Sequence, residues 1–235
     1  MTKEATFAEK VLQFNHYLSS VSLDVPMGFN IINPFSGVQK EQVRQMTVSF
    51  YQKYYNDTNT RRLILGSSPA RRGSAITGVP FEDVVHLQKE TGVSIDGFHI
   101  NQSSSEFLYD VIEAYGGCTK FYATFYMNFV CPLGICKTGS NGRAVNYNYY
   151  ESKKMQDVLY PFILHTLYTQ VAFGVDTSVC YCIGSGGNYS FLSKVNKELG
   201  LFQTLVPLEH PRFIMQYNAK RKAFYLQKYL DALCI

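Results

Sequence analysis

Three short stretches of this sequence place polar, glycine and proline residues directly after apolar segments. The first is Gly66–Phe81, the second is Met127–Gly134 and the third is Leu208–Asn218. In an open parallel sheet, the loops that follow the strands meet at one edge, where such sheets bind their ligands. We therefore expect the three stretches to form one site for a planar, polar ligand.

The first stretch has the residues of a ligand-binding loop. Gly66 allows a tight turn, and Ser67 and Ser68 offer hydroxyl and backbone N–H groups. No Gly-Lys-Ser/Thr sequence follows, so this is not a phosphate-binding P-loop. Phe81 ends the stretch, either as an aromatic wall for a planar ligand or as a core residue that covers the sheet edge.

The other two stretches carry an amide and an imidazole at strand ends. Asn128 either presents a donor and an acceptor to a ligand or ties down the backbone of its own loop. His210 is followed by cationic, bulky and amide side chains of the kind that fill the gap left by a base extruded from DNA. The candidates for this role are Arg212, Phe213, Gln216 and Asn218.

The elements that must position these residues follow from the hydrophobic pattern. Four apolar segments predict strands that are covered on both faces: Leu63–Gly66, Phe121–Val130, Ser178–Gly184 and Thr204–Leu208. Helical spacing recurs in Glu4–Leu18, Gln39–Tyr54, Glu106–Tyr115, Glu151–Phe173, Ser190–Leu199 and Ala219–Leu233. The alternation predicts one α/β domain over residues 1–235, a three-layer α/β/α sandwich around a four-stranded parallel sheet. We expect the polar stretch Asn141–Tyr150 to be a surface loop.

Composition and charge limit the class of protein. The chain has 235 residues and a net charge of +4, which permits a polyanionic partner without requiring one. It has no apolar run of membrane-spanning length, and the segment Met1–Ala5 lacks the layout of a signal peptide. Six cysteines show no zinc-ligand spacing, so we expect buried thiols and neither a metal nor another cofactor. We expect a cytoplasmic protein, associated with the nucleoid if it is bacterial.

The order and content of the three stretches resemble the uracil-DNA glycosylase superfamily, most closely its single-strand-selective monofunctional (SMUG-type) branch. In that branch the first loop reads Gly-Met-Asn-Pro-Gly and runs on to Thr-Gly-Val-Pro-Phe, and Thr77–Phe81 matches the latter in residue and spacing. The second motif is similar to Asn128 before Cys131-Pro132-Leu133, with one residue more between them than expected. The third begins His-Pro and contains an arginine, like His210–Arg212.

The resemblance implies a monomeric glycosylase that excises uracil, with other deaminated bases as further substrates, and leaves an abasic site in DNA. Phe81 would stack on the extruded base, Asn128 would read its edge, and His210 would donate a hydrogen bond to O2 as charge builds on the departing base. Ser68 stands where the family carries the asparagine that positions the attacking water. This departure, with the divergence after Arg212, indicates a second, divergent SMUG-like group.

Alternatives remain open at this point. The serine at position 68 also fits a catalytically weak or silent protein that keeps the fold and binds DNA. Glu82 or Asp83 could take over the activation of water, although both also suit the start of a helix, which we favour. An unrelated hydrolase is disfavoured because Gly-x-Ser-x-Gly is absent. Arg71, Arg72, Ser185 and Gly186 are further candidates for binding DNA phosphates, the last two through backbone N–H groups at a helix start.

Overall fold

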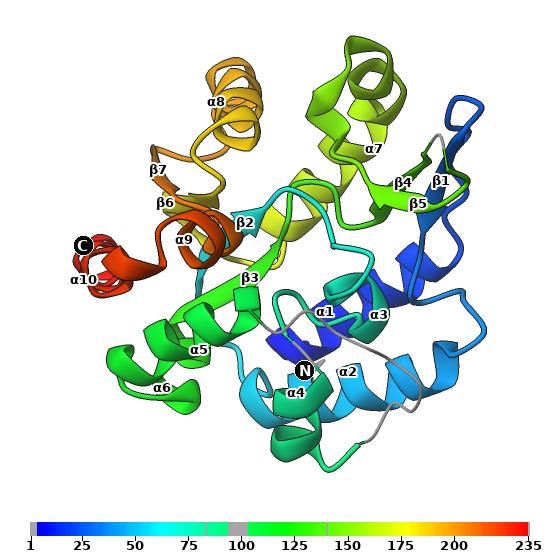
Figure 1. The fold of residues 1–235 in the computed structure, drawn as a ribbon. Coiled ribbons are helices and arrows are strands. Elements are labelled where there is room, and N and C mark those ends of the chain that lie inside the picture. Colours follow the sequence, from blue (N-terminus) through cyan, green and yellow to red (C-terminus); the bar gives the residue numbers. More distant parts are fainter. Residues whose placement is uncertain (1–3, 83, 94–102, 140, 235) are drawn as a thin grey trace.

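A four-stranded parallel sheet forms the centre of the molecule. The computed structural model describes residues 4–82, 84–93, 103–139 and 141–234. The strands are β2 (Arg62–Gly66), β3 (Phe125–Phe129), β6 (Asp176–Ile183) and β7 (Thr204–Leu208), in the spatial order β3-β2-β6-β7 (Figure 1). All neighbouring pairs are parallel, so all four carboxyl ends lie at one edge of the sheet. The predicted sheet is confirmed.

Helices cover both faces of this sheet, which makes the fold a three-layer α/β/α sandwich, as predicted (Figure 1). Cys182 of β6 faces Asn188, which belongs to the layer of α7 (Lys153–Val171) and α8 (Gly187–Leu199). Tyr181, the residue before Cys182 in β6, packs on Phe125 of β3 and faces the layer of helices on the other side of the sheet. That layer contains α5 (Ser103–Tyr115), α6 (Cys118–Thr124), α9 (Pro211–Tyr217) and α10 (Lys222–Leu233).

An aromatic cluster fastens the amino-terminal helices to the side of the sheet formed by β3. Helix α1 (Phe7–Ser19) starts at a capping box between Thr6 and Glu9, and α2 (Lys40–Tyr54) packs beside it. The ring of Phe7 lies 5.7 Å from that of Tyr55 and 5.1 Å from that of Tyr126 in β3. These contacts lie at the amino end of β3, and Asn15 of α1 and Tyr51 of α2 extend the cover to the pocket lined by Asn128.

A second sheet, which the sequence did not predict, lies beside the carboxyl edge. It is antiparallel and consists of β1 (Phe29–Ile32), β4 (Gly134–Thr138) and β5 (Ala144–Asn146). The stretch expected as a surface loop thus contains a strand and the short 3-10 helix η1 (Tyr149–Glu151), in which Tyr149 is fully buried. Its hydroxyl donates to Oδ1 of Asn188 in α8, so the end of this stretch belongs to the packed structure, whereas residues 141–146 are exposed as predicted.

Other boundaries also differ from the predictions. The amino-terminal part of the predicted strand Phe121–Val130 lies in helix α6, and only Phe125–Phe129 is strand. Short helices α3 (Ser74–Thr77) and α4 (Val84–Thr91) follow β2, and the 3-10 helix η2 (Ala219–Arg221) precedes α10. Cys131, Cys136, Cys180 and Cys182 are buried free thiols, as predicted, whereas Cys118 is partly exposed and Cys234 is exposed. Within the described ranges, no helix is both long and apolar enough to cross a membrane.

Candidate active site

The strand register places the three motif stretches at the same edge. Gly66 at the end of β2 lies beside Phe129 of β3, and Ile183 at the end of β6 lies beside Leu208 of β7. Neighbouring strands are about 4.8 Å apart, so the loops after β3 and β7 start roughly 14 Å from each other. The chain leaves β2 for β3 on one side and later returns to β6 on the other, which makes this edge a topological switch point.

The Ser67-Ser68 segment is held by the backbone that follows β3 and by the loop between β5 and η1. The carbonyls of Gly66 and Ser67 accept hydrogen bonds from the N–H groups of Val130 and Cys131 at 2.8 and 2.9 Å. The Ser67 hydroxyl donates to Oδ1 of Asn148 at 3.2 Å, so this side chain is used within the protein. Ser68 is partly exposed, and its hydroxyl makes no hydrogen bond with the described residues.

Phe81 occupies a backbone conformation that few aromatic residues adopt. Its φ of +63° lies in the left-handed region, and its N–H donates to Oγ of Ser74 at 2.7 Å. Its half-buried ring stacks on Phe129, with centroids 5.0 Å apart and planes 29° apart. A Cβ atom at position 66 would lie 2.5 Å from the tip of this ring, so Gly66 is required for the stack. Phe81 is therefore both packed against the sheet edge and partly open to a ligand.

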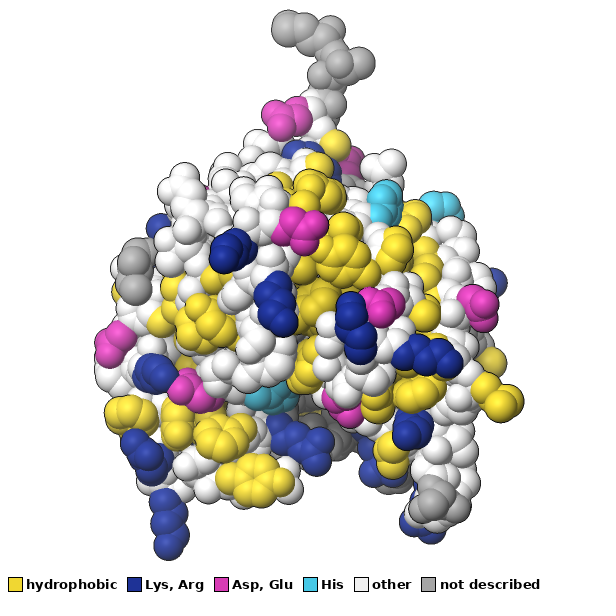
Figure 2. All heavy atoms as spheres, turned by 90° about the horizontal axis from the view of Figure 1, so that it is seen from above, with side chains coloured by type: hydrophobic (Ala, Val, Ile, Leu, Met, Phe, Trp, Pro, Cys, Tyr) yellow, Lys and Arg dark blue, Asp and Glu magenta, His cyan; other side chains and the backbone are white. Residues whose placement is uncertain are grey.

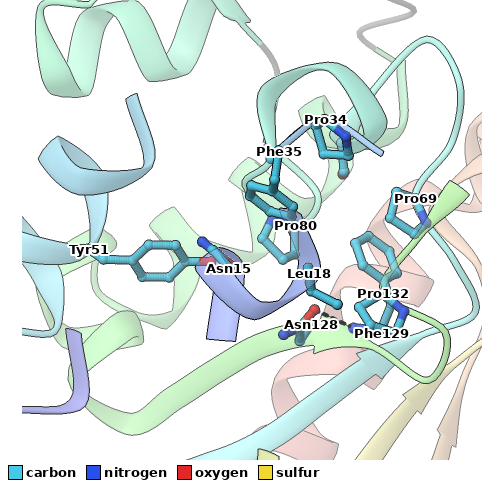
Figure 3. A pocket seen from close by; sticks show the side chains of 12 residues that line it. Asn15, Leu18, Pro34, Phe35, Tyr51, Pro69, Pro80, Asn128, Phe129 and Pro132 are labelled. Carbon is cyan, nitrogen blue, oxygen red and sulfur yellow. Dashed lines mark hydrogen bonds between the residues drawn. The ribbon is translucent and has the colours of Figure 1, made fainter. Parts of the chain in front are cut away.

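Asn128 lines a pocket at the end of β3, with Pro69 and Pro80 from the first motif stretch and Asn15 and Tyr51 from α1 and α2 (Figure 3). The amide makes two local hydrogen bonds: its Oδ1 accepts from the N–H of Phe129 at 2.9 Å, and its Nδ2 donates to the hydroxyl of Tyr126 at 2.6 Å. These bonds fix the orientation of the amide. They leave one N–H and one oxygen lone pair for another partner.

The amide of Asn128 and the ring of Phe81 lie on different sides of β3. Side chains alternate along a strand, and Phe129 faces Gly66 and Phe81. Asn128 therefore faces the side of Tyr126 and α1. The structure thus brings Gly66, Phe81 and Phe129 into contact and places Asn128 in the adjoining pocket.

His210 lies between β7 and α9 and caps that helix. Its Nδ1 accepts the backbone N–H of Arg212 at 3.1 Å, so Nδ1 carries no proton and Nε2 of the neutral ring carries one. Solvent reaches the residue, but protein atoms around the ring dehydrate it, and the guanidinium of Arg212 repels a second proton. These two causes lower the pKa of His210 from 6.5 to about 4. The ring is therefore a neutral hydrogen-bond donor at physiological pH.

The lowered pKa of His210 predicts a pH dependence of stability. Below pH 6.5 the unfolded chain binds a proton that the folded chain does not take up until about pH 4, so stability is lost as pH falls through this window. We expect the melting temperature of the wild type to fall more steeply between pH 6.5 and 4 than that of His210→Asn, which keeps a side-chain cap for α9. Thermal melts of both proteins across this range measure the difference, and parallel curves would contradict the assignment.

The surface beyond His210 combines basic and aromatic side chains. Arg212, Phe213 and Gln216 are exposed, Asn218 is partly exposed, and Nε of Arg212 donates to Oε1 of Gln216 at 3.1 Å. Tyr217 follows with its ring 6.3 Å from that of Phe213. Figure 2 shows basic and hydrophobic side chains interleaved at the lower left, on the side where Figure 1 places α9 and α10. Such a surface suits a nucleic-acid strand, whose phosphates and bases need both kinds of contact.

The remaining candidate residues lie on either side of this edge. Arg71 and Arg72 line a groove between α3 and the segment 32–43, and the N–H of Arg71 donates to Oδ1 of Asn146 at 3.0 Å. Ser185 and Gly186 are exposed at the start of α8, which begins at Gly187. Asn146 was missed at the sequence level, as was Asn148, because an asparagine-rich stretch resembles a solvated loop.

Comparison with known proteins identifies the family. The family model of the uracil DNA glycosylase superfamily matches residues 52–234. The chain belongs to the uracil-DNA glycosylase superfamily. It is also similar to the crystal structure of wild-type SMUG2 from Pedobacter heparinus, with 44% identity, a TM-score of 0.91 and coverage of 97% of each chain. None of the curated proteins matches the chain.

These comparisons confirm the resemblance to a second SMUG-like group and support a DNA glycosylase activity for this uracil-DNA glycosylase homologue. In the described part of the chain, no three histidine, cysteine or acidic side chains are grouped so that they could hold a metal ion. Asp83, one of the two acids considered for water activation, lies outside the described residues.

Proposed function

We propose that this protein is a monofunctional uracil-DNA glycosylase, which cleaves the bond between uracil and deoxyribose and leaves an abasic site. The observation that carries this proposal is the geometry of His210. Because its Nδ1 accepts the N–H of Arg212, the neutral ring carries its N–H at Nε2. A fixed donor of this kind suits the negative charge that develops on O2 as uracil departs.

The mechanism that we propose depends on the leaving group more than on the nucleophile. The C–N bond breaks, the bonding electrons leave with uracil as an anion, and the sugar becomes an oxocarbenium ion. His210 stabilises the anion, Phe81 stacks on the base, and the free N–H and lone pair of Asn128 read its imide edge. Water then adds to the sugar and loses a proton, with the partly exposed hydroxyl of Ser68 orienting it less firmly than an amide would.

Two further features support this reading. None of the three motif stretches contains a lysine, so Schiff-base chemistry and strand cleavage are not expected. The exposed basic and aromatic residues of α9, beginning next to His210, suit a DNA strand on both sides of a flipped nucleotide. We propose that the protein acts as a monomer on uracil-containing DNA, with other deaminated bases as further substrates, in the cytoplasm or the nucleoid.

The direct test is incubation with a uracil-containing oligonucleotide, followed by alkali to cut abasic sites. We expect cleavage at uracil only after alkali, from single-stranded or duplex substrate. The absence of abasic sites under every salt and strand condition would refute the proposal.

The replacement of the family asparagine by Ser68 favours a second candidate, a catalytically weak or silent glycosylase fold that binds DNA. Its expected signature is tight, salt-sensitive binding to uracil-containing DNA without release of the base. Measured turnover excludes it, so the same oligonucleotide separates the two functions.

The proposal predicts that Phe213→Ala weakens DNA binding. Its ring is 44% exposed in the first turn of α9, and stacking of one base on an aromatic ring contributes about 1–3 kcal/mol. We expect a loss of affinity of about tenfold for a uracil-free oligonucleotide, measured by fluorescence anisotropy. Tyr168→Ala is the matched control, because that ring is 49% exposed on α7, away from α9. Equal losses in both variants would show that the position of Phe213 is unimportant.

A further inference from the structure

A buried carboxylate directly follows the stacking residue. Glu82 is 4% exposed, and its two carboxylate oxygens accept hydrogen bonds from the hydroxyls of Tyr109 in α5 and Tyr122 in α6. The sequence favoured a helix start for this residue, and Glu82 does lie just before α4 (Val84–Thr91). Its side chain, however, reaches into the layer formed by α5 and α6, so it joins the first motif stretch to two helices from later in the chain.

The two tyrosines are suited to hold this carboxylate. An ionised carboxylate loses its hydration on burial and needs hydrogen-bond donors in compensation. Burial, with the adjacent charge of Glu82, raises the pKa of Tyr122 well above its ordinary value, so this hydroxyl keeps its proton and remains a donor. Tyr122 is itself fixed by aromatic contacts with Phe50 and Phe121. The carboxylate is therefore attached to the rigid core.

Glu82 directly follows Phe81, the residue whose backbone conformation is strained. Phe81 has a φ of +63°, a conformation that persists only when its surroundings enforce it. On its amino side the N–H of Phe81 is held by Ser74, and its ring is held by Phe129. On its carboxyl side, Glu82 provides the anchor through its side chain and through its N–H, which donates to the carbonyl of Val79 at 3.3 Å.

We propose that Glu82, held by Tyr109 and Tyr122, is a positioning residue that keeps Phe81 in its left-handed conformation and so aims the ring at the flipped base. This inference rests on the proposed function, because it assigns Phe81 to base stacking. Without the anchor, the loop relaxes to an ordinary backbone conformation and the ring leaves Phe129. The anchor acts through Phe81 alone and does not touch the base.

The test is a double-mutant cycle on the full chain. We expect Tyr109→Phe with Tyr122→Phe to slow single-turnover excision of uracil about tenfold, and to have less than a twofold effect when Phe81→Ala is already present. Glu82→Gln, which keeps an acceptor oxygen, should retain more activity than Glu82→Leu. Tyr55→Phe is the control, because it removes another buried hydroxyl, one that donates to the carbonyl of Phe125, and it should leave the rate unchanged.

A second readout does not require activity. In protein labelled with 4-fluorophenylalanine, the ¹⁹F resonance of Phe81, assigned by its loss in Phe81→Leu, should shift in the two-tyrosine variant and stay in place in Tyr55→Phe. An unshifted resonance, or an equal loss of rate with and without Phe81, overturns the inference. Failure of the wild type to release uracil instead counts against the proposed function, and the resonance still decides the role of Glu82.

Discussion

His210→Ala is expected to slow uracil release by about 10²–10³-fold, the effect of removing one fixed donor to a developing anion. The loss should fall on the rate of the chemical step at saturating enzyme, because the donor acts on charge that is absent in the bound substrate. Single-turnover kinetics on a uracil-containing oligonucleotide measure it. His165→Ala, an exposed histidine on α7, is the matched control and should retain the wild-type rate.

The protonation state of His210 gives the same prediction a second readout. With a pKa of about 4, the ring stays neutral from pH 8 to about 5, so the wild-type rate should not change through protonation of His210 over this range. A donor that worked as an imidazolium would instead gain activity as pH falls through 6.5.

Ser68→Ala should reduce the single-turnover rate of uracil release by less than about tenfold, the value of one ordinary hydrogen bond. A larger loss for Ser68→Ala than for His210→Ala would reverse the proposed order of importance.

The central sheet could be predicted because burial on both faces leaves a clear pattern. The short apolar segment Leu63–Gly66 lies in β2 (Arg62–Gly66), where these four residues are all buried. The edge strand β7 (Thr204–Leu208) has the predicted bounds, but of its residues only Leu208 is buried. The run that begins at Phe121 could not be divided in this way, because an apolar stretch looks alike as a buried helix and as a buried strand. The second sheet was missed since the strand Ala144–Asn146 is exposed and polar at its end, like an ordinary loop.

The sequence could predict that the candidate residues lie at one edge of the sheet, but not the direction in which each side chain points. Loop order and residue type located Phe81, Asn128 and His210 at one edge, and the structure places all three there. The side of the strand that Asn128 faces depends on its register with Gly66, which no local pattern reveals. The partners of Glu82 come from two later helices, so contacts distant in sequence decide where its carboxylate lies. Helix α9 had a local signal, since Pro211 follows a side chain able to cap a helix.

A leaving-group mechanism explains why Ser68 and an intact His210 can coexist in one site. If the base departs as an anion before water attacks, the barrier depends mostly on the donor at O2 and little on the positioning of water. The fixed tautomer of His210 preserves that donor, whereas the hydroxyl of Ser68 forms no hydrogen bond with the described residues and is not held in a fixed direction. In this mechanism the two departures from the family pattern act separately. The serine at position 68 affects the positioning of water, and the spacing of Asn128 affects recognition of the base.

Asn128→Asp is expected to reduce uracil excision about 100-fold or more while leaving the fold intact. The new carboxylate can still accept the N–H of Phe129, and the hydroxyl of Tyr126 can turn to donate to it, so both local hydrogen bonds survive. What disappears is the N–H for O4 of uracil, which is replaced by an acceptor that repels it. A site that hydrogen-bonds a substrate group discriminates strongly when that bond cannot form. Single-turnover rates and melting temperatures of the variant measure the two parts of this expectation.

The control for this change is Asn15→Asp, which places a carboxylate in the wall of the same pocket from α1. If Asn128 reads the base edge, the variant at position 128 loses far more activity than the variant at position 15, with similar melting temperatures. Equal losses would mean that a buried charge in the pocket is harmful wherever it lies. Unchanged excision by Asn128→Asp would assign the amide to its two local hydrogen bonds alone, and the uracil edge would then be read by another group at the end of β2 or β3.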